Sequence, residues 1–327
     1  MVTPLLRHDA WYARRLAPPA GELRVVIDTD AANEIDDPFA IAWALRRPDR
    51  LRVEAVYATP YSFAHRRAQM HVQQHPQFDP PGVGMARSHA AILEVFERLG
   101  LDARGRVWRG STRYLPSLDA PERSEAVEHL IAAAMAMPAE EPLYVVAIGC
   151  ATNVANALLL EPRIAERIVV VWTSGYPSHA PQVNDSFNLE QDLPASQWLL
   201  DSGVPLVYLP GFHVGAQLRL SLPEMERWVA GRGAIGEHLM QLYTHNPLWP
   251  LLGITDFEAH SWVIWDLICV AWLLDPDWVP SEIVRTPRLG SDRRWIADAS
   301  RHPMREAYGV QRDAIFRDFF ACLPARA

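Results

Sequence analysis

The sequence predicts an α/β fold, with an open and mostly parallel β-sheet that carries helices on both of its faces. Apolar, β-branched runs alternate with helical patterns along the chain, which is typical of this class. The runs are almost continuously apolar, as in strands that are covered on both sides. The chain has 327 residues, of which 49% are hydrophobic, and is long enough to bury a sizeable core.

The expected elements follow one another in a regular order. Residues 23–27 form the first strand, and the helical pattern at 38–45 begins with a proline, as helices often do. Residues 52–58 form the second strand, and a long polar region follows it. The remaining expected elements are helices at 124–137, 152–160 and 194–202 and strands at 143–149, 167–175 and 205–210.

The domain organisation is simple, because no internal repeat or low-complexity linker divides the chain. We expect a single domain over residues 22–327, with a helical insertion at about 222–260. Residues 1–21 mix Pro, Arg and aromatic residues without periodicity, and we expect a leader packed on the surface of the domain. Ligands of open parallel sheets bind beyond the carboxyl ends of the strands, so polar residues after each strand are the functional candidates.

The composition excludes several classes of function. The formal charge of -8 argues against binding to nucleic acid or to an anionic membrane. The chain has no lysine, which excludes Schiff-base chemistry and the P-loop. Its three cysteines lack CxxC spacing, and the N-terminus has no apolar stretch long enough for a signal peptide or a membrane span. We therefore expect a cytoplasmic protein.

A dense acidic cluster follows the first strand. Asp28, Asp30, Glu34, Asp36 and Asp37 lie within ten residues, where the chain leaves a strand that is expected to be buried. Carboxylates gathered in a partly buried site need protons or a hard cation, so the cluster predicts a Ca²⁺ or Mg²⁺ site. A solvated acidic loop is the structural alternative. The functional alternative is a DxD-type phosphohydrolase. The absence of lysine disfavours this alternative.

A second acid interrupts an apolar run far along the chain. Asp266 lies within residues 261–276, and a lone buried carboxylate is costly unless it is paired or bound to a metal. A structural helix cap is the alternative role for this residue.

Four segments, in order, resemble motifs of the inosine-uridine-preferring nucleoside hydrolase family. The family patterns are DxDxGxDD, GxxTNxAxAL, EFNxxxDxxAA and HDxxAxAxxxxP. The similar segments here are VVIDTDAANEIDDPFAIAWAL (25–45), IGCATNVANALLLEP (148–162), DSFNLEQDLPASQWLL (185–200) and WDLICVAWLLDP (265–276). The resemblance implies a Rossmann-like nucleoside hydrolase architecture, and an enzyme that cleaves the N-glycosidic bond of a nucleoside, purine-type or modified, as a homodimer or homotetramer.

The resemblance also implies roles for individual residues. Asp30, Asp37 and Asp266 would bind Ca²⁺ together with the backbone carbonyl of Thr152, and Asp30 would also be the general base for the attacking water. Asp36 and Asn188 would hold the sugar hydroxyls. The reaction passes through an oxocarbenium-like transition state, which an anionic site stabilises.

The acidic motif departs from the family pattern in its length. Five residues separate Asp30 from Asp36, where the family has three. Asn33 and Glu34 are therefore predicted to enter the site and to contact the substrate, unless they only cap the following helix.

Other departures concern the sugar and the base. Ser186 stands where the family has a ribose-binding Glu, and Asn184 or Glu34 is a candidate to compensate for its loss. Trp265 replaces a histidine and is predicted to stack on the base, with core packing as the alternative. Trp172, at the end of an expected strand, is predicted to line the sugar pocket or to pack in the core.

The leaving-group acid cannot be assigned from these motifs. The candidates for this acid, or for a group that binds the base, lie in or near the expected insertion, which would form a lid over the site. They are His245, Asn246, Trp249, His260 and Trp262. A protein that binds a sugar or nucleoside without turnover is the alternative to the enzyme, because the departures affect residues with assigned roles.

Overall fold

The computed structural model describes residues 6–138 and 140–326, so residues 1–5 of the expected leader lie outside the described part. Its strands follow most of the expected pattern. The strands of the central sheet are β1 (Leu23–Thr29), β2 (Leu51–Ala58), β3 (Val107–Arg109), β4 (Leu143–Ala147), β5 (Ile168–Ser174), β6 (Leu206–Pro210), β9 (Ser281–Arg285) and β12 (Pro303–Ala307). Two small antiparallel pairs are β7 (Arg219–Leu220) with β8 (Trp262–Val263) and β10 (Arg288–Leu289) with β11 (Trp295–Ile296).

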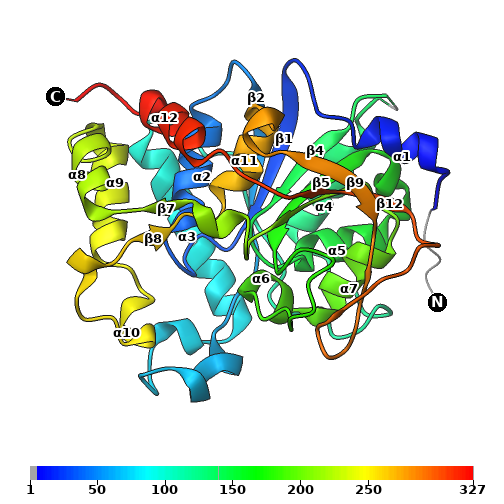
Figure 1. Cartoon of the computed structure of the whole chain (residues 1–327), viewed down its shortest axis with the longest axis horizontal. Helices are drawn as coiled ribbons and strands as arrows, with labels where there is room; N and C mark the ends of the chain where they lie inside the picture. Colours follow the sequence, from blue (N-terminus) through cyan, green and yellow to red (C-terminus); the bar gives the residue numbers. More distant parts are fainter. Residues whose placement is uncertain (1–5, 139, 327) are drawn as a thin grey trace.

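The central sheet confirms the predicted fold class. Within the described residues, its eight strands have the order β3-β2-β1-β4-β5-β6-β12-β9 (Figure 1). Neighbouring strands are parallel except β12 and β9, which are antiparallel. The chain moves outward from β1 through β2 to β3, and then returns to place β4 on the other side of β1. This reversal is the topological switch point, where parallel sheets form their binding crevices.

Helices cover both faces of the sheet. The α-helices are α1 (Asp9–Arg15), α2 (Asp36–Leu45), α3 (Pro81–Arg98), α4 (Glu125–Met135), α5 (Thr152–Leu160), α6 (Phe187–Glu190), α7 (Leu193–Asp201), α8 (Leu222–Trp228), α9 (Gly233–Thr244), α10 (Trp249–Leu252), α11 (Leu267–Leu274) and α12 (Arg312–Cys322). Short 3-10 helices are η1 (Ala64–Gln69), η2 (Pro76–Phe78), η3 (Pro162–Glu166), η4 (Gly215–Gln217), η5 (Phe257–Ala259) and η6 (Pro276–Trp278). Among these described helices, none combines the length and the apolar character that a membrane crossing needs.

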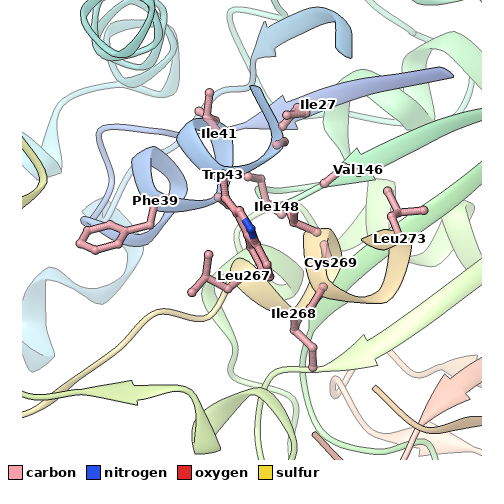
Figure 2. Packing of buried hydrophobic residues seen from close by; sticks show 14 of the residues in the cluster. Ile27, Phe39, Ile41, Trp43, Val146, Ile148, Leu267, Ile268, Cys269 and Leu273 are labelled. Atoms are coloured by element: carbon pink, nitrogen blue, oxygen red, sulfur yellow. The ribbon is translucent and has the colours of Figure 1, made fainter. Parts of the chain in front are cut away.

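The side chains of β1 show why both faces are apolar. Val25 and Ile27 pack in one hydrophobic cluster, whereas Val26 packs in a second cluster on the opposite face, because side chains alternate along a strand. Figure 2 shows the first cluster, where Trp43 of α2 and Leu267 of α11 pack close to the sheet. The second cluster includes buried residues of α4, α5 and α7. The two clusters hold the carboxyl ends of the strands in fixed positions.

Two parts of the structure differ from the expected pattern. Helix α2 begins at Asp36, two residues before Pro38, and Pro38 lies in its first turn, where a backbone N–H has no partner within the helix in any case. The region after β2, expected as a long polar connection, contains helix α3 and strand β3. Only one face of α3 is buried, through residues such as Met85, Ile92 and Val95, so its apolar positions are spread among polar ones.

The N-terminal segment contains helix α1. Tyr12 of this helix is fully buried, and its hydroxyl donates a hydrogen bond to the Gly203 carbonyl at 2.7 Å. The segment therefore packs against the loop that precedes β6.

Candidate functional site

A cavity of about 150 Å³ opens at the carboxyl ends of the central strands. Its wall includes Ile148 after β4, Thr173 and Ser174 at the end of β5, and Gly211 after β6. The loop between β1 and α2, the start of α6 and the segment before α11 complete the wall. The cavity thus lies at the switch point that the strand order creates.

Three carboxylates from distant parts of the sequence meet in the cavity wall. Each of Asp36, Asp37 and Asp266 offers a carboxylate oxygen, and the three oxygens lie within 4.8 Å of one another. The side chains are almost fully buried. Asp36 and Asp37 begin α2, and Asp266 directly precedes α11, so the packing of these two helices brings the carboxylates together.

Burial and mutual repulsion disfavour the charged forms of these carboxylates. Burial raises the pKa of Asp37 to about 7, although a hydrogen bond from Thr29 Oγ1 opposes this shift. Burial, followed by repulsion from neighbouring carboxylates, raises the pKa values of Asp36 and Asp266 well above their usual range. The group therefore needs protons or a cation.

The donor set fits a hard divalent cation. Asp36 Oδ1, Asp37 Oδ2 and Asp266 Oδ2 are buried and have no hydrogen-bond partner among the described residues. Buried carboxylate oxygens are normally hydrogen-bonded or bound to a metal. An all-oxygen donor set of this kind is the one that Ca²⁺ and Mg²⁺ prefer.

Asp30 lies beside this group. It is fully buried, and burial followed by the charge of Asp37 raises its pKa well above the usual range. A hydrogen bond from Gln191 Nε2 reaches Asp30 Oδ2 at 3.4 Å, and Gln191 Oε1 accepts one from the Tyr114 hydroxyl at 2.8 Å. Asp30 Oδ1 has no partner among the described residues. The structure thus places Asp36, expected to bind the sugar, among the three clustered oxygens, with Asp30 next to them.

Neighbouring polar contacts fix the base of the site. Thr152 begins α5, and its Oγ1 donates to Asp192 Oδ2 at 2.5 Å. Asn153 Nδ2 donates to Asp28 Oδ1 at 2.8 Å, and burial raises the pKa of Asp28 to about 7. These bonds tie α5 to the start of α7 and to the end of β1.

Asn33 and Glu34 both line the cavity. The alternative role for them, capping the following helix, is wrong, because the N-cap residue of α2 is Ile35 and no side chain caps this helix. Asn33 is 4% exposed, and its Oδ1 has no partner among the described residues. Glu34 Oε2 accepts a hydrogen bond from Trp262 Nε1 at 3.0 Å. The longer acidic loop therefore contributes side chains to the cavity.

The polar wall opposite the acidic loop includes Asn188 and Ser186. Asn188 Nδ2 donates to the carbonyls of Ile148 and Thr173, at 3.1 and 3.2 Å. These bonds leave its Oδ1 as the atom that can accept from a ligand. Ser186 Oγ accepts from the Gly175 amide at 2.8 Å and lies 2.6 Å from Ser174 Oγ, so this hydroxyl is already engaged.

Aromatic side chains form the remaining wall. Trp265 lines the cavity, as predicted for a stacking residue, and Phe212 meets it edge to face with ring centroids 6.0 Å apart. Phe187 also lines the cavity and is stacked on Phe63, with ring centroids 4.0 Å apart. A planar ring system can bind between such surfaces.

Three residues named as substrate contacts lie outside the cavity lining. Trp172 is fully buried in the second hydrophobic cluster, and its Nε1 donates to the Gly149 carbonyl at 3.2 Å. Asn184 uses its whole amide group, with Oδ1 accepting from Tyr176 and Nδ2 donating to Arg293. His260 is exposed, and its ring bonds the backbone of its own turn.

The sequence reasoning missed other members of the wall. Ser174 ends β5, and Phe212 lies two residues after the end of β6. Both positions were a usable signal, because the carboxyl ends of parallel strands meet at one edge. Arg66 lines the cavity from η1 and forms an ion pair with Glu190. The position of Arg66 in the wall depends on how the segment after β2 folds back.

Comparison with known proteins identifies relatives of this chain. A family model described as "Inosine-uridine preferring nucleoside hydrolase" matches residues 25–310. The chain is 27% identical over 259 residues to the non-specific ribonucleoside hydrolase RihC of Salmonella agona, covering 78% of this chain and 79% of that protein. It is 25% identical over 283 residues to the pyrimidine-specific ribonucleoside hydrolase RihA of Klebsiella pneumoniae, covering 78% and 80%.

Solved structures show the same fold. A purine-preferring ribonucleoside hydrolase from Gardnerella vaginalis has a TM-score of 0.68 with this chain at 20% identity, covering 91% of this chain and 97% of that one. The family match over most of the sequence decides against the phosphohydrolase and against a binding protein without turnover. The chain belongs to the inosine-uridine preferring nucleoside hydrolase family and is an enzyme that hydrolyses the N-glycosidic bond of ribonucleosides.

Proposed function

We propose that this enzyme is a calcium-dependent hydrolase of purine-type or modified ribonucleosides, and that it releases the free base and the sugar. The observation that carries the proposal is the group of three buried carboxylates in the cavity wall. They offer oxygens within 4.8 Å of one another, and each has an unpartnered oxygen among the described residues. The family is metal-dependent. Asp37 and Asp266 would hold the ion together with Asp30 and the carbonyl of Thr152, and Asp36 lies close enough to add an oxygen.

The residues around the acidic group have complementary roles in this proposal. When bound, calcium supplies a positive centre that gathers the sugar hydroxyls and the attacking water. Asp30 accepts the proton of that water, since its Oδ1 is unpartnered and its other oxygen is held by Gln191. Asp36 and Asn188 orient the sugar, and Asn33 Oδ1 offers a further acceptor in the cavity. The surrounding carboxylates stabilise the positive charge that develops on the ribose.

The aromatic wall supports the preference for purines. Trp265, Phe212 and Phe187 offer flat apolar surface, and a double ring covers more of it than a single ring. His260, one of the expected candidates, is exposed and lies outside the cavity lining.

A nucleoside panel tests the proposed function. Purified protein is incubated with inosine, guanosine, adenosine, uridine and cytidine, and the free base and the reducing sugar are measured. We expect release of both, with kcat/KM for inosine roughly tenfold above that for uridine. EDTA is expected to abolish the release, and Ca²⁺ to restore it better than Mg²⁺. Base release that persists in EDTA would overturn the calcium proposal, and a preference for uridine would overturn the purine proposal.

We also propose a cytoplasmic location and a homodimeric or homotetrameric assembly. The three cysteines, Cys150, Cys269 and Cys322, are free, which fits a reducing compartment. Analytical ultracentrifugation of the purified chain tests the assembly, and a monomer at micromolar concentration would contradict it.

A further inference from the structure

The loop at residues 31–35 is held from outside the cavity by two buried side chains. Gln77 Nε2 donates to the carbonyls of Ala32 and Asn33, at 2.7 and 2.6 Å. The Tyr61 hydroxyl donates to the Ala32 carbonyl at 2.9 Å and also lies 2.9 Å from Gln77 Oε1. Tyr61 is 1% exposed and Gln77 is 4% exposed. Buried hydrogen bonds of this kind give the loop one backbone conformation.

Trp262 holds the same loop by its side chain. Its Nε1 donates to Glu34 Oε2 at 3.0 Å, although the two residues are 228 positions apart in the sequence. Trp262, Ala32 and Phe187 all pack against a third hydrophobic cluster, to which Tyr61 belongs. The cluster therefore joins the loop, the segment after β2 and strand β8 into one wall of the cavity.

The polar groups of the cavity leave one sugar hydroxyl without an obvious partner. In the proposed function the calcium ion, Asp36, Asn188 and Asn33 serve the two adjacent ring hydroxyls, so the 5′-hydroxyl needs an acceptor elsewhere. The hydroxyl of Ser186 is engaged by Gly175 and Ser174, and Asn184 lies outside the cavity lining. Glu34 lines the cavity and keeps its second carboxylate oxygen for a ligand, while Trp262 binds the first.

We propose that Glu34 accepts a hydrogen bond from the 5′-hydroxyl of the substrate sugar, an inference that rests on the proposed function. Tyr61, Gln77 and Trp262 are positioning residues that hold the carboxylate at this place. They act through the loop backbone and through the Glu34 side chain, and they do not touch the substrate. The enzyme thereby discriminates against sugars that lack the 5′-hydroxyl, because the site leaves an acceptor unpaired with them.

Substrate analogues that lack one hydroxyl test the contact. The discrimination ratio is kcat/KM for inosine divided by kcat/KM for 5′-deoxyinosine. For the wild type we expect a ratio of about 10 to 150, because the lost contact is a hydrogen bond to a carboxylate. Glu34→Gln and Trp262→Phe are each expected to lower this ratio roughly tenfold. The corresponding ratio for 3′-deoxyinosine stays unchanged. Trp228→Phe is the matched control, because Trp228 is an exposed tryptophan of α8.

The positioning role has a second readout that needs no substrate. Gln77→Leu and Tyr61→Phe are expected to lower the 5′ ratio and to raise the hydrogen exchange of the peptide at 31–39 about tenfold. Gln197→Leu and Tyr12→Phe are the matched controls, since each also removes a hydrogen bond to a backbone carbonyl but lies elsewhere. These controls leave both readouts at the wild-type value.

The results separate this inference from the proposed function. If the wild type releases no base from any nucleoside, the proposed function fails, and the ratio is then taken from the Kd values of inosine and 5′-deoxyinosine. A wild-type ratio near 1, by either measure, overturns the inference while base release sustains the function. The inference is also overturned if Glu34→Gln or Trp262→Phe leaves the discrimination against 5′-deoxyinosine unchanged. It is overturned as well if these variants lose discrimination against 3′-deoxyinosine instead.

Discussion

The carboxylates of Asp36, Asp37 and Asp266 make the stability of this protein depend on pH and on bound cation. Their oxygens lie within 4.8 Å of one another, and two unit charges at that distance repel by about 3.5 kcal/mol at an effective dielectric constant of about 20. Three such pairs amount to about 10 kcal/mol, which is comparable to the whole stability of a typical protein. Without a cation, the folded chain must therefore take up protons here.

The direction of the pH dependence follows from the pKa shifts. Burial raises the pKa of Asp37 to about 7 in the folded chain, and the pKa values of Asp36 and Asp266 are also raised well above their usual range. In the unfolded chain these groups titrate near 3.9. The folded state thus binds more protons between about pH 4 and pH 7, so the stability of cation-free protein falls as the pH rises through this window.

Thermal unfolding measures this effect. In excess EDTA the Tm is expected to fall by several degrees between pH 5 and pH 8. At pH 7.5, Ca²⁺ at about 100 times its Kd adds about 2.7 kcal/mol, which for 327 residues raises the Tm by about 4 °C. Asp266→Asn is expected to flatten the pH dependence in EDTA and to abolish the calcium shift, whereas Asp49→Asn, at an exposed carboxylate, changes neither.

Two results would refute this reasoning. A Tm in EDTA that stays constant or rises from pH 5 to pH 8 would mean that the three carboxylates are not destabilised by one another. A Tm that calcium leaves unchanged at pH 7.5 would mean that the group holds no such ion.

Two further predictions concern single residues. Asp30→Asn is expected to lower kcat by several orders of magnitude, because it removes the general base. The Tm in EDTA is not expected to fall, because the substitution also removes a buried charge. Activity within tenfold of the wild type would show that Asp30 is not the base. Gly110→Ala is expected to lower the free energy of unfolding by about 2 kcal/mol or more, since a Cβ there would lie 2.0 Å from the Ala58 carbonyl oxygen and 2.4 Å from Asn153 Nδ2. Chemical denaturation measures this loss. Gly215→Ala is the control, because the nearest atom to a Cβ at Gly215 is 3.5 Å away. Equal stability of the two variants would contradict the argument.

The expected strands and helices were predictable because their signal is local. The apolar run at 23–27 and the alternation that follows it need only neighbouring residues to be recognised, and β1, β4, β5 and β6 are all present. Helix α3 escaped the same reasoning because it begins with the residues Pro-Gly-Val-Gly, which are typical of a turn, and strand β3 because it has only three residues. A turn-like start or a very short strand hides an element within a polar segment.

Some site residues were predictable from a local pattern, and others were not. The position of Asp30, Asp36 and Asp37 after a buried strand indicated a polar site, and the loop length indicated that Asn33 and Glu34 enter it. The orientation of Trp172 was harder to predict: side chains alternate along β5, so Val171 packs in the first cluster and Trp172 in the second. Counting the alternation from the end of the strand would have been needed to place it.

The sequence by itself determined the α/β class, the acidic loop and the motifs that place the chain in its family, because all of these are patterns of neighbouring residues. Only the tertiary structure decided which distant groups meet. Asp266 joins Asp36 and Asp37 because α2 and α11 pack against each other over the sheet, and Trp262 reaches Glu34 across 228 positions of sequence. Such contacts depend on the packing of whole elements, which fixes distances that no local pattern contains.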